Sequence, residues 1–242
     1  MGWMQIADHR QDFNYHAYIY RTDTHPFRTA TSGGVPIGSG LNTLSNYRWV
    51  DFERIKWKKC SDITAADCLT PKGFSFMRID ISGGSDDATG VYIDFYNVHT
   101  DAGTSAIDYW ARQDNVKQLA DYIAANSAGN GVIMYGDFNS LYSRKDTAVR
   151  ELLAGETAAG AGFRDVWVEL KQGGVIPGDK PECGTPASGD CETLDKVFYR
   201  SGTGVALQAT EFRYDTANFL QADGSILSDH NPVYVNFSWT AK

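Results

Sequence analysis

Alternation of apolar and polar residues predicts strands in several parts of the chain. Residues 72–81 and 91–99 alternate along their length, and the glycine and aspartate residues between them predict an antiparallel hairpin with a long loop. The aromatic residues 13–20 also alternate, which predicts a strand with one wet face. Three further strands are predicted at residues 41–45, 194–200 and 232–239.

Helical spacing replaces alternation after the second strand of this hairpin. Apolar residues recur at helical spacing from Trp110 to Ile123, and the pattern predicts a helix that ends before Gly129. The other face of this helix is polar, and we expect it to be solvated. The apolar face comprises Trp110, Val116, Leu119 and Ile123, and the polar face comprises Arg112, Lys117 and Asp121.

A short apolar run, residues 132–135, follows the helix and predicts a strand that is buried on both faces. A strand, a helix and a strand in this order, preceded by hairpins, predict a mixed sheet with helices packed against it. Residues 145–153 predict a short helix, residues 163–170 another ordered segment and residues 173–190 a loop, whereas residues 1–10 contain no complete element.

Two polar residues stand where this buried strand ends. Asp137 and Asn139 are two residues apart, so in an extended segment both side chains face one pocket while Phe138 turns into the core. A carboxylate and a carboxamide together suit a site for a metal or a phosphate. A segment that begins with Gly136 and continues in this way is also an ordinary turn, and the motif alone does not decide between the two interpretations.

The chain is long and apolar enough to form a large core. It has 242 residues, 42% of them hydrophobic, and no repeat or linker divides it, so we expect a single domain over residues 1–242. The formal net charge of -8 would repel a polyanion at long range, which lowers the expectation of a nucleic acid substrate without excluding it. No apolar run approaches membrane-spanning length. Residues 1–5 do not resemble a signal peptide, so we expect any export signal to be missing or removed.

The four cysteines form two close pairs in segments rich in turn-forming residues. Pairing of neighbours, Cys60 with Cys68 and Cys183 with Cys191, is the simplest of three possible connectivities. Zinc binding is the alternative, but the spacing is not that of a zinc knuckle and no histidine is nearby in the sequence. Two local disulfides would indicate an oxidising, extracellular setting.

Two compositional features allow more than one interpretation. Residues 31–40 are rich in glycine and predict a long loop, because a phosphate-binding P-loop would need a lysine and a following helix, which this segment lacks. Aromatic residues make up 13% of the chain. Exposed ones could contact a membrane surface, although most aromatic side chains lie in a core.

Residue types that bind cations or move protons stand at the ends of four predicted strands. Ligands of α/β proteins collect beyond strand ends, so convergence of these four ends would form a polar, charged cleft. The residues are His99, Asp137 with Asn139, Asp195, and Asp229 with His230.

The segments around these residues resemble, in the same order, the motifs of the endonuclease/exonuclease/phosphatase superfamily. That superfamily includes DNase I-like nucleases, inositol polyphosphate phosphatases and neutral sphingomyelinases. The strand after Cys60 and Cys68 further resembles the secreted sphingomyelinase-like branch. The motifs are Asn97-Val98-His99, Gly136-Asp137-Phe138-Asn139, Asp195-Lys196-Val197-Phe198 and Ser228-Asp229-His230-Asn231-Pro232-Val233.

The resemblance implies a DNase I-like fold, a four-layered α/β sandwich in which two packed mixed or antiparallel sheets are flanked by helices. It also implies hydrolysis of a phosphoester in a phospholipid headgroup or a nucleic acid, with Mg²⁺ or another divalent cation as cofactor. We expect a monomer without an obligate protein partner. By the resemblance, His230 would act as general base or as its partner in proton transfer, and Asp195 would orient it. Asp137 and Asn139 would position the nucleophile and the phosphate, and His99 would hydrogen-bond phosphoryl oxygens. Asp229 would lie at the metal.

The start of the chain departs from the family pattern. The family begins with a strand and a helix for which this chain starts too late, and a second strand then ends in a glutamate that is the principal metal ligand. In one register Gln11 replaces this glutamate, and in the other the shorter Asp12 does; we favour the first. Two hypotheses follow: a metal-dependent phosphodiesterase whose activity is impaired, or a non-catalytic member that binds a phosphate, lipid, glycan or protein ligand.

Overall fold

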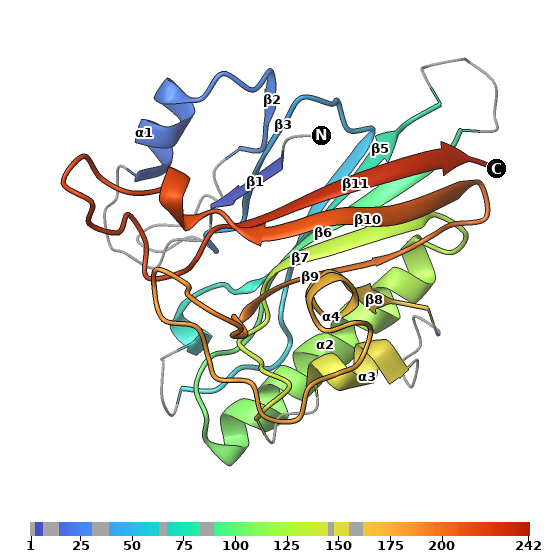
Figure 1. Ribbon diagram of the computed structural model, residues 1–242. Helices are drawn as coiled ribbons and strands as arrows, with labels where there is room; N and C mark the ends of the chain where they lie inside the picture. The colour runs from blue at the N-terminus through green and yellow to red at the C-terminus, as the bar shows by residue number, and fades with distance from the viewer. Residues whose placement is uncertain are drawn as a thin grey trace.

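A six-stranded mixed sheet lies at the centre of this computed structural model (Figure 1). Only β6 and β7 run parallel; all other neighbours in the sheet are antiparallel. In spatial order the strands are β4 (Asp51–Lys56), β5 (Gly73–Asp80), β6 (Tyr92–His99), β7 (Gly131–Asp137), β9 (Asp195–Arg200) and β8 (Arg164–Asp165). The structure describes residues 3–6, 15–30, 39–62, 67–82, 90–144, 148–154 and 162–242.

Two smaller sheets accompany the main sheet. The first pairs β10 (Val205–Tyr214) with β11 (Val233–Ala241) in antiparallel orientation. The second has the order β1-β3-β2 and consists of β1 (Trp3–Ile6), β3 (Asn42–Ser45) and β2 (Phe27–Arg28).

Both small sheets lie on the same face of the main sheet. Tyr199 of β9 packs edge-on against Phe237 of β11, with ring centroids 5.3 Å apart. On β6, Asn97 donates a hydrogen bond from Nδ2 to the carbonyl of Asn42 on β3. Strand pairing places Asn97 and Tyr199 on the face that also carries Tyr135.

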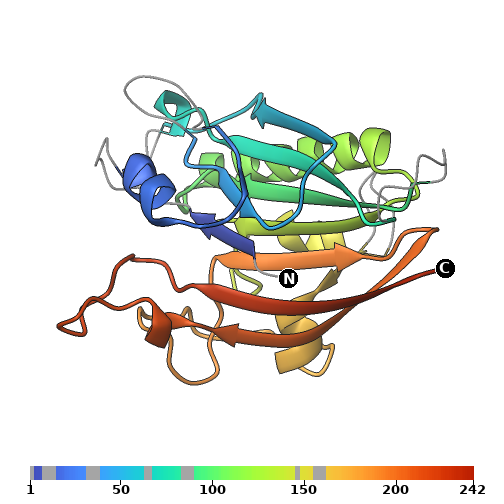
Figure 2. The same ribbon diagram turned by 90° about the horizontal axis from the view of Figure 1, so that it is seen from above.

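The helices α2 and α3 lie on the opposite face, below the main sheet in Figure 1 and behind it in Figure 2. Tyr122 of α2 (Ala106–Asn126) packs edge-on against Phe74 and Tyr96 of the main sheet. The short helix α3 (Ala148–Ala154) contacts α2, and α4 (Val166–Lys171) contacts β9 and β10. The predicted mixed sheet with helices packed against it is confirmed. In the described part of the chain, however, the second β-layer consists of two small sheets rather than one large one.

Most of the predicted elements are present. The strands expected at residues 41–45, 72–81, 91–99, 194–200 and 232–239 correspond to β3, β5, β6, β9 and β11, and the buried strand at 132–135 corresponds to β7. The hairpin of β5 and β6 is antiparallel as predicted. The helices expected after β6 and at residues 145–153 correspond to α2 and α3.

The prediction of a strand at residues 13–20 is wrong, because the segment forms the helix α1 (Tyr15–Thr22). At its end, Tyr20 donates a hydrogen bond from its hydroxyl to the carbonyl of Thr29 and to Oδ1 of Asn42. A short aromatic run fits both the period of a strand and that of a helix. Here the contacts of Tyr20 with Thr29 and Asn42 favour the helix.

Five strands were not predicted, and two of them, β2 and β8, have only two residues each. Residues 1–10 contain β1, which pairs with the distant β3, so local pattern gives no signal for it. Strand β4 is half exposed and carries charged residues. In β10 a bulge between Ala209 and Glu211 interrupts the alternation that would have indicated a strand.

The polar face predicted for α2 is only partly correct. Lys117 and Asp121 form an exposed ion pair, but Arg112 is fully buried and donates to the carbonyls of Asp101 and Gly103. The loop before the helix folds over Arg112, and its carbonyls need donors. The expected apolar face is correct for Val116, Leu119 and Ile123, which are buried. Trp110, by contrast, is 51% exposed, and the ammonium group of Lys59 lies over its ring.

The two disulfides form between neighbours in sequence, as predicted. Cys60 is bonded to Cys68 and Cys183 to Cys191, which excludes zinc binding by these thiols. No described helix is both long and apolar enough to cross a membrane. Most of the glycine-rich stretch at 31–40 lies outside the described residues.

Gly136 occupies a position where β6 and β7 approach each other too closely for a side chain. A Cβ atom there would lie 2.0 Å from the carbonyl oxygen of Val98, and the glycine has φ +139°. We expect Gly136→Ala to lower the free energy of unfolding by roughly 3 kcal/mol or more, measured by denaturant titration. Gly162→Ala is the matched control, because Gly162 also has positive φ (+116°), but a Cβ there would meet no atom of the described residues within 4 Å. Equal losses in both variants would show that the close approach has no effect.

Asp101 predicts a specific dependence of stability on pH. Its carboxylate is buried and accepts a hydrogen bond from the amide of Ser61; burial raises its pKa from 3.8 to about 6. Between these values the folded chain keeps a proton that the unfolded chain has lost, so stability falls as pH rises from about 4 to 6. Asp101→Asn removes this loss and still accepts the bond from Ser61. We expect its melting temperature to exceed that of the wild type by about 2–4 °C at pH 7 and by less at pH 4; calorimetry at both pH values tests this, and equal shifts would contradict it.

Candidate functional site

Strand register places three of the predicted site residues in a row. His99 ends β6 and pairs with Asp137 at the end of β7, and Asp137 pairs in turn with Asp195 at the start of β9. Paired residues of neighbouring strands point to the same side of a sheet. The three side chains therefore lie side by side on the face that carries the small sheets.

The segment after β7 turns instead of continuing as a strand. Asn139 has a left-handed backbone, with φ +47°, which asparagine tolerates better than most residues. Its amide nitrogen donates to Oδ1 of Asp137 (2.8 Å) and its side-chain Nδ2 to Oδ2 (3.0 Å), while Phe138 is fully buried in the core. The expected convergence of carboxylate and carboxamide occurs, but through a turn.

The orientation of the Asn139 carboxamide follows from its two acceptors. Nδ2 donates to Oδ2 of Asp137 and, at 3.3 Å, to the carbonyl of Thr100. Neither acceptor can donate, so the nitrogen must face them. Oδ1 of Asn139 is therefore directed away from both and suits a water, a hydroxyl or a cation.

His230 reaches the row from the loop before β11. Its Nδ1 lies 2.7 Å from Oδ2 of Asp195, and its Nε2 lies 4.0 Å from Oδ2 of Asp137. The hydrogen bond with Asp195 raises the pKa of His230 to about 9. Burial raises the pKa of Asp195, although the bond from His230 opposes this effect. A histidine oriented by a carboxylate in this way can hold or transfer a proton at Nε2.

His99 lies on the other side of Asp137. Its Nε2 is 3.6 Å from Oδ2 of Asp137, and its side chain is 3% exposed. The indole Nε1 of Trp57 donates to the carbonyl of His99, which fixes the end of β6. The structure thus brings together His99, Asp137, Asn139, Asp195 and His230.

The residues predicted to bind metal are not part of this group. Asp229 is exposed, and no described hydrogen bond or ion pair joins its carboxylate to the group. Gln11 and Asp12 lie outside the described residues. Among the residues that the structure does describe, no three histidine, cysteine or acidic side chains are placed to hold a metal ion.

The donor chemistry around the site nevertheless suits a hard dication. Asp137 and Asp195 supply carboxylates inside the group, and Asp229 supplies an exposed one nearby in the sequence. The hydrogen bond with Asp195 raises the pKa of His230 to about 9. Mg²⁺ prefers oxygen ligands and needs only one or two protein carboxylates, the remainder being water or substrate oxygens.

Sequence reasoning missed two buried polar residues next to the site. Lys196, 4% exposed, follows Asp195 and pairs with the buried Glu192. Asn231, 6% exposed, follows His230 and forms side-chain hydrogen bonds with the loop that contains Cys183. Both stand inside motifs already noted, but nothing in the sequence indicates that they are buried.

Comparisons with known proteins identify the family to which the chain belongs. The profile of the endonuclease/exonuclease/phosphatase family 2 matches residues 4–170. The chain is 35% identical over 243 residues to proteins of Mycobacterium tuberculosis and Mycobacterium bovis, each named sphingomyelinase. The alignment covers 98% of this chain and 46% of those proteins, so the chain spans about half the length of these curated relatives.

Solved structures share the fold at low identity. D. rerio TDP2 in complex with a single-strand DNA product has a TM-score of 0.63 and 16% identity, covering 98% of this chain and 84% of that one. A mutant of beta toxin from Staphylococcus aureus with bound magnesium ions has a TM-score of 0.56 and 15% identity, covering 91% of this chain and 80% of that one. Sphingomyelinase C from Streptomyces griseocarneus has a TM-score of 0.52 and 17% identity, covering 91% of this chain and 79% of that one. The family profile matches more than half of this chain and shows that it belongs to the endonuclease/exonuclease/phosphatase family.

Proposed function

We propose that this chain is a metal-dependent phosphodiesterase that hydrolyses a phospholipid headgroup ester, as in sphingomyelin. The observation that carries the proposal is the 2.7 Å contact between Asp195 and His230 beside Asp137 and Asn139. The identity of 35% to the mycobacterial sphingomyelinases favours a phospholipid over a nucleic acid. The net charge of -8 favours it too, because it repels a polyanion.

Within the proposed reaction, His230 transfers the proton. Asp195 accepts from Nδ1 and leaves Nε2 to face the reacting oxygens. With a pKa of about 9 in the chain without a cation, the imidazole is protonated at neutral pH, which suits donation to the leaving oxygen. Action as a general base on water, the other role implied by the resemblance, requires the neutral ring.

The remaining residues of the group would bind the phosphate and the nucleophile. Asn139, fixed by Asp137 and Thr100, would present Oδ1 to the attacking water. His99 would hydrogen-bond a phosphoryl oxygen as negative charge develops. Asp137 would help to hold both histidines in place, because its Oδ2 lies 3.6 Å from Nε2 of His99 and 4.0 Å from Nε2 of His230.

A divalent cation, Mg²⁺ by the resemblance, fits the proposal. Asp229 would bind it through its exposed carboxylate, together with Gln11 or Asp12. When bound, such a cation polarises phosphoryl oxygens and offsets negative charge.

The setting of the reaction is part of the proposal. Two disulfides favour an extracellular location. A phospholipid substrate would bring the chain to a membrane surface, where the exposed Trp110 and Leu227 are of the right chemistry for contact. We propose a monomer that needs no protein partner.

One observation favours a second candidate function. If Gln11 stands where the family has its metal-binding glutamate, the chain has a neutral ligand in place of a charged one. A chain with this exchange would retain the pocket for a phosphate group but turn over slowly or not at all. The alternative is therefore a non-catalytic member that binds a phosphate-bearing, lipid, glycan or protein ligand.

Metal removal tests the first proposal directly. We expect release of phosphocholine from sphingomyelin vesicles with Mg²⁺ and none with EDTA. His230→Ala should lower kcat by about 10³-fold, a typical loss for a proton-transferring side chain. His25→Ala is the matched control, because His25 pairs only with the nearby Asp23 and lies in the segment after α1. Absence of turnover on phospholipid, DNA and phosphomonoesters alike would refute the enzyme proposal and leave the binding function.

The identity of the metal ligand near the start of the chain is a separate prediction. A carboxylate binds Mg²⁺ more tightly than a neutral carboxamide, so we expect Gln11→Glu to tighten Mg²⁺ binding by roughly tenfold or more, at least the size of effect seen when only an outer partner of a metal ligand changes. Titration calorimetry with Mg²⁺ alone measures this whether or not the chain turns over substrate. Asp12→Glu is the comparison: a gain in that variant with none in Gln11→Glu would assign the ligand position to Asp12.

A further inference from the structure

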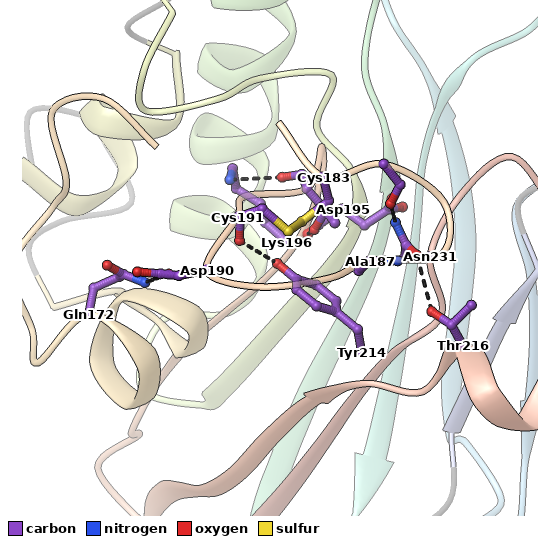
Figure 3. The surroundings of a disulfide bond; sticks show 12 residues. Gln172, Cys183, Ala187, Asp190, Cys191, Asp195, Lys196, Tyr214, Thr216 and Asn231 are labelled. Atoms are coloured by element: carbon purple, nitrogen blue, oxygen red, sulfur yellow. Dashed lines mark hydrogen bonds between the residues drawn. A yellow bond between two sulfur atoms is a disulfide. The ribbon is translucent and has the colours of Figure 1, made fainter. Parts of the chain in front are cut away.

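The two residues of the proton-transfer pair come from separate segments of the chain. Asp195 starts β9, whereas His230 lies 35 residues later in the loop before β11. The loop closed by the Cys183–Cys191 disulfide lies between these segments and contacts both (Figure 3).

On the histidine side, the loop binds the two residues that flank His230. Thr185 donates from Oγ1 to the carbonyl of Asp229 at 2.7 Å. The amide of Ala187 donates to Oδ1 of Asn231 at 2.7 Å, and Nδ2 of Asn231 donates to the carbonyl of Gly184 at 2.9 Å. Three hydrogen bonds from one short loop therefore fix the backbone on both sides of the histidine.

Asn231 also connects this loop to the rest of the fold. Its Oδ1 accepts a further hydrogen bond from Thr216 in the 3-10 helix η2 (Thr216–Asn218), after β10. Figure 3 shows Asn231 between Ala187 and Thr216. A buried carboxamide with partners on both its oxygen and its nitrogen holds one orientation.

On the aspartate side, the loop ends in a buried ionic contact. Glu192 follows Cys191, and its Oε1 accepts from the amide of Tyr142 and from the ammonium group of Lys196. Lys196 is the neighbour of Asp195 on β9 and also lies 4.7 Å from the ring centroid of Tyr142. The end of the loop is thereby joined to the start of the strand that carries the aspartate.

Little apolar burial holds the loop itself in shape. Between its cysteines, Gly184, Pro186, Ser188, Gly189 and Asp190 are exposed. A loop with so few buried side chains samples many conformations unless other bonds restrict it. Here the disulfide and the hydrogen bonds described above supply that restriction.

We propose that the Cys183–Cys191 loop positions the Asp195–His230 pair, with Thr185 and Asn231 as its positioning residues on the histidine side. The positioning of the pair by the loop does not depend on the proposed function. The effect of that positioning on turnover does rest on the proposed function. A displacement of about 1 Å can cost roughly a hundredfold in rate. Loss of loop contacts should therefore lower kcat and leave KM nearly unchanged, because neither positioning residue lies in the group that would bind the phosphate.

Substitutions of Thr185 separate the hydrogen bond from side-chain packing. Thr185→Val is isosteric and lacks the donor, whereas Thr185→Ser retains it. We expect Thr185→Val to lower kcat roughly tenfold and to speed amide hydrogen exchange in residues 226–232 about fivefold, the loss of one hydrogen bond. Thr185→Ser should restore both values. Ser188→Ala, at an exposed position of the same loop, is the control and should match the wild type.

The two disulfides provide a matched comparison for the covalent constraint. Each joins cysteines eight residues apart, so their removal changes the entropy of the unfolded chain similarly. The double variant C183S/C191S should speed exchange in residues 226–232, and C60S/C68S should not. If C183S/C191S does not fold, the Thr185 pair decides the question.

The exchange data keep this inference distinct from the proposed function. Unchanged exchange in residues 226–232 for both Thr185→Val and C183S/C191S would overturn the positioning role, whatever the activity. Faster exchange with kcat unchanged in an active chain would overturn it as well. Faster exchange in a chain without turnover on any substrate would retain the positioning of His230 and refute only the proposed phosphodiesterase.

Discussion

The close approach of β6 and β7 at Gly136 is the constraint on which the site depends. With no Cβ atom at this position, the backbone of β7 comes so near to Val98 that a methyl group would overlap its carbonyl oxygen. The parallel register that results puts His99 beside Asp137, and the antiparallel pairing with β9 adds Asp195. A shift of one residue in either pairing would turn a site residue to the helix-covered face. The glycine therefore permits the close pairing in which these three side chains are aligned.

Loops complete what the sheet begins, and each disulfide holds one of them. The Cys60–Cys68 pair stabilises the turn from which Ser61 binds Asp101, two residues after His99. The Cys183–Cys191 pair closes the loop that forms hydrogen bonds with the residues on both sides of His230. Loops carry functional residues because a rigid scaffold positions them. In this chain the scaffold positions His99, Asp137 and Asp195 directly, whereas the histidine from the loop needs additional bonds.

Sequence patterns predicted those elements whose apolar residues alternate with polar ones or recur at helical spacing, such as β5, β6 and α2, although β5 and β6 prove to be buried on both faces. They failed where a distant contact decides the structure: α1 is anchored through Tyr20, and β1 exists through its pairing with β3. Arg112 was misassigned because a helical pattern cannot show that a loop will fold over a charged side chain. For the site, motifs identified the five residues that converge, but not the turn at Asn139 or the buried Asn231, since neither backbone conformation nor burial is visible in residue type.

Charge balance explains why a single side chain near the start of the chain matters to function. Asp137 and Asp195 lie beside His99 and His230, and Asp229 precedes His230 in the sequence; the bond to Asp195 raises the pKa of His230 to about 9. A phosphodiester brings another negative charge, so its binding is unfavourable unless a cation compensates. No three described histidine, cysteine or acidic side chains are placed to bind that cation, so in the proposed function its remaining ligands would be water, substrate oxygens or a residue among 7–14. A carboxylate there would bind the cation before the substrate arrives, whereas a neutral glutamine would leave most of that binding to the substrate phosphate itself. The Asp195–His230 pair is thus in place among the described residues, and under the proposed function turnover would depend on which of these two ligands the chain presents.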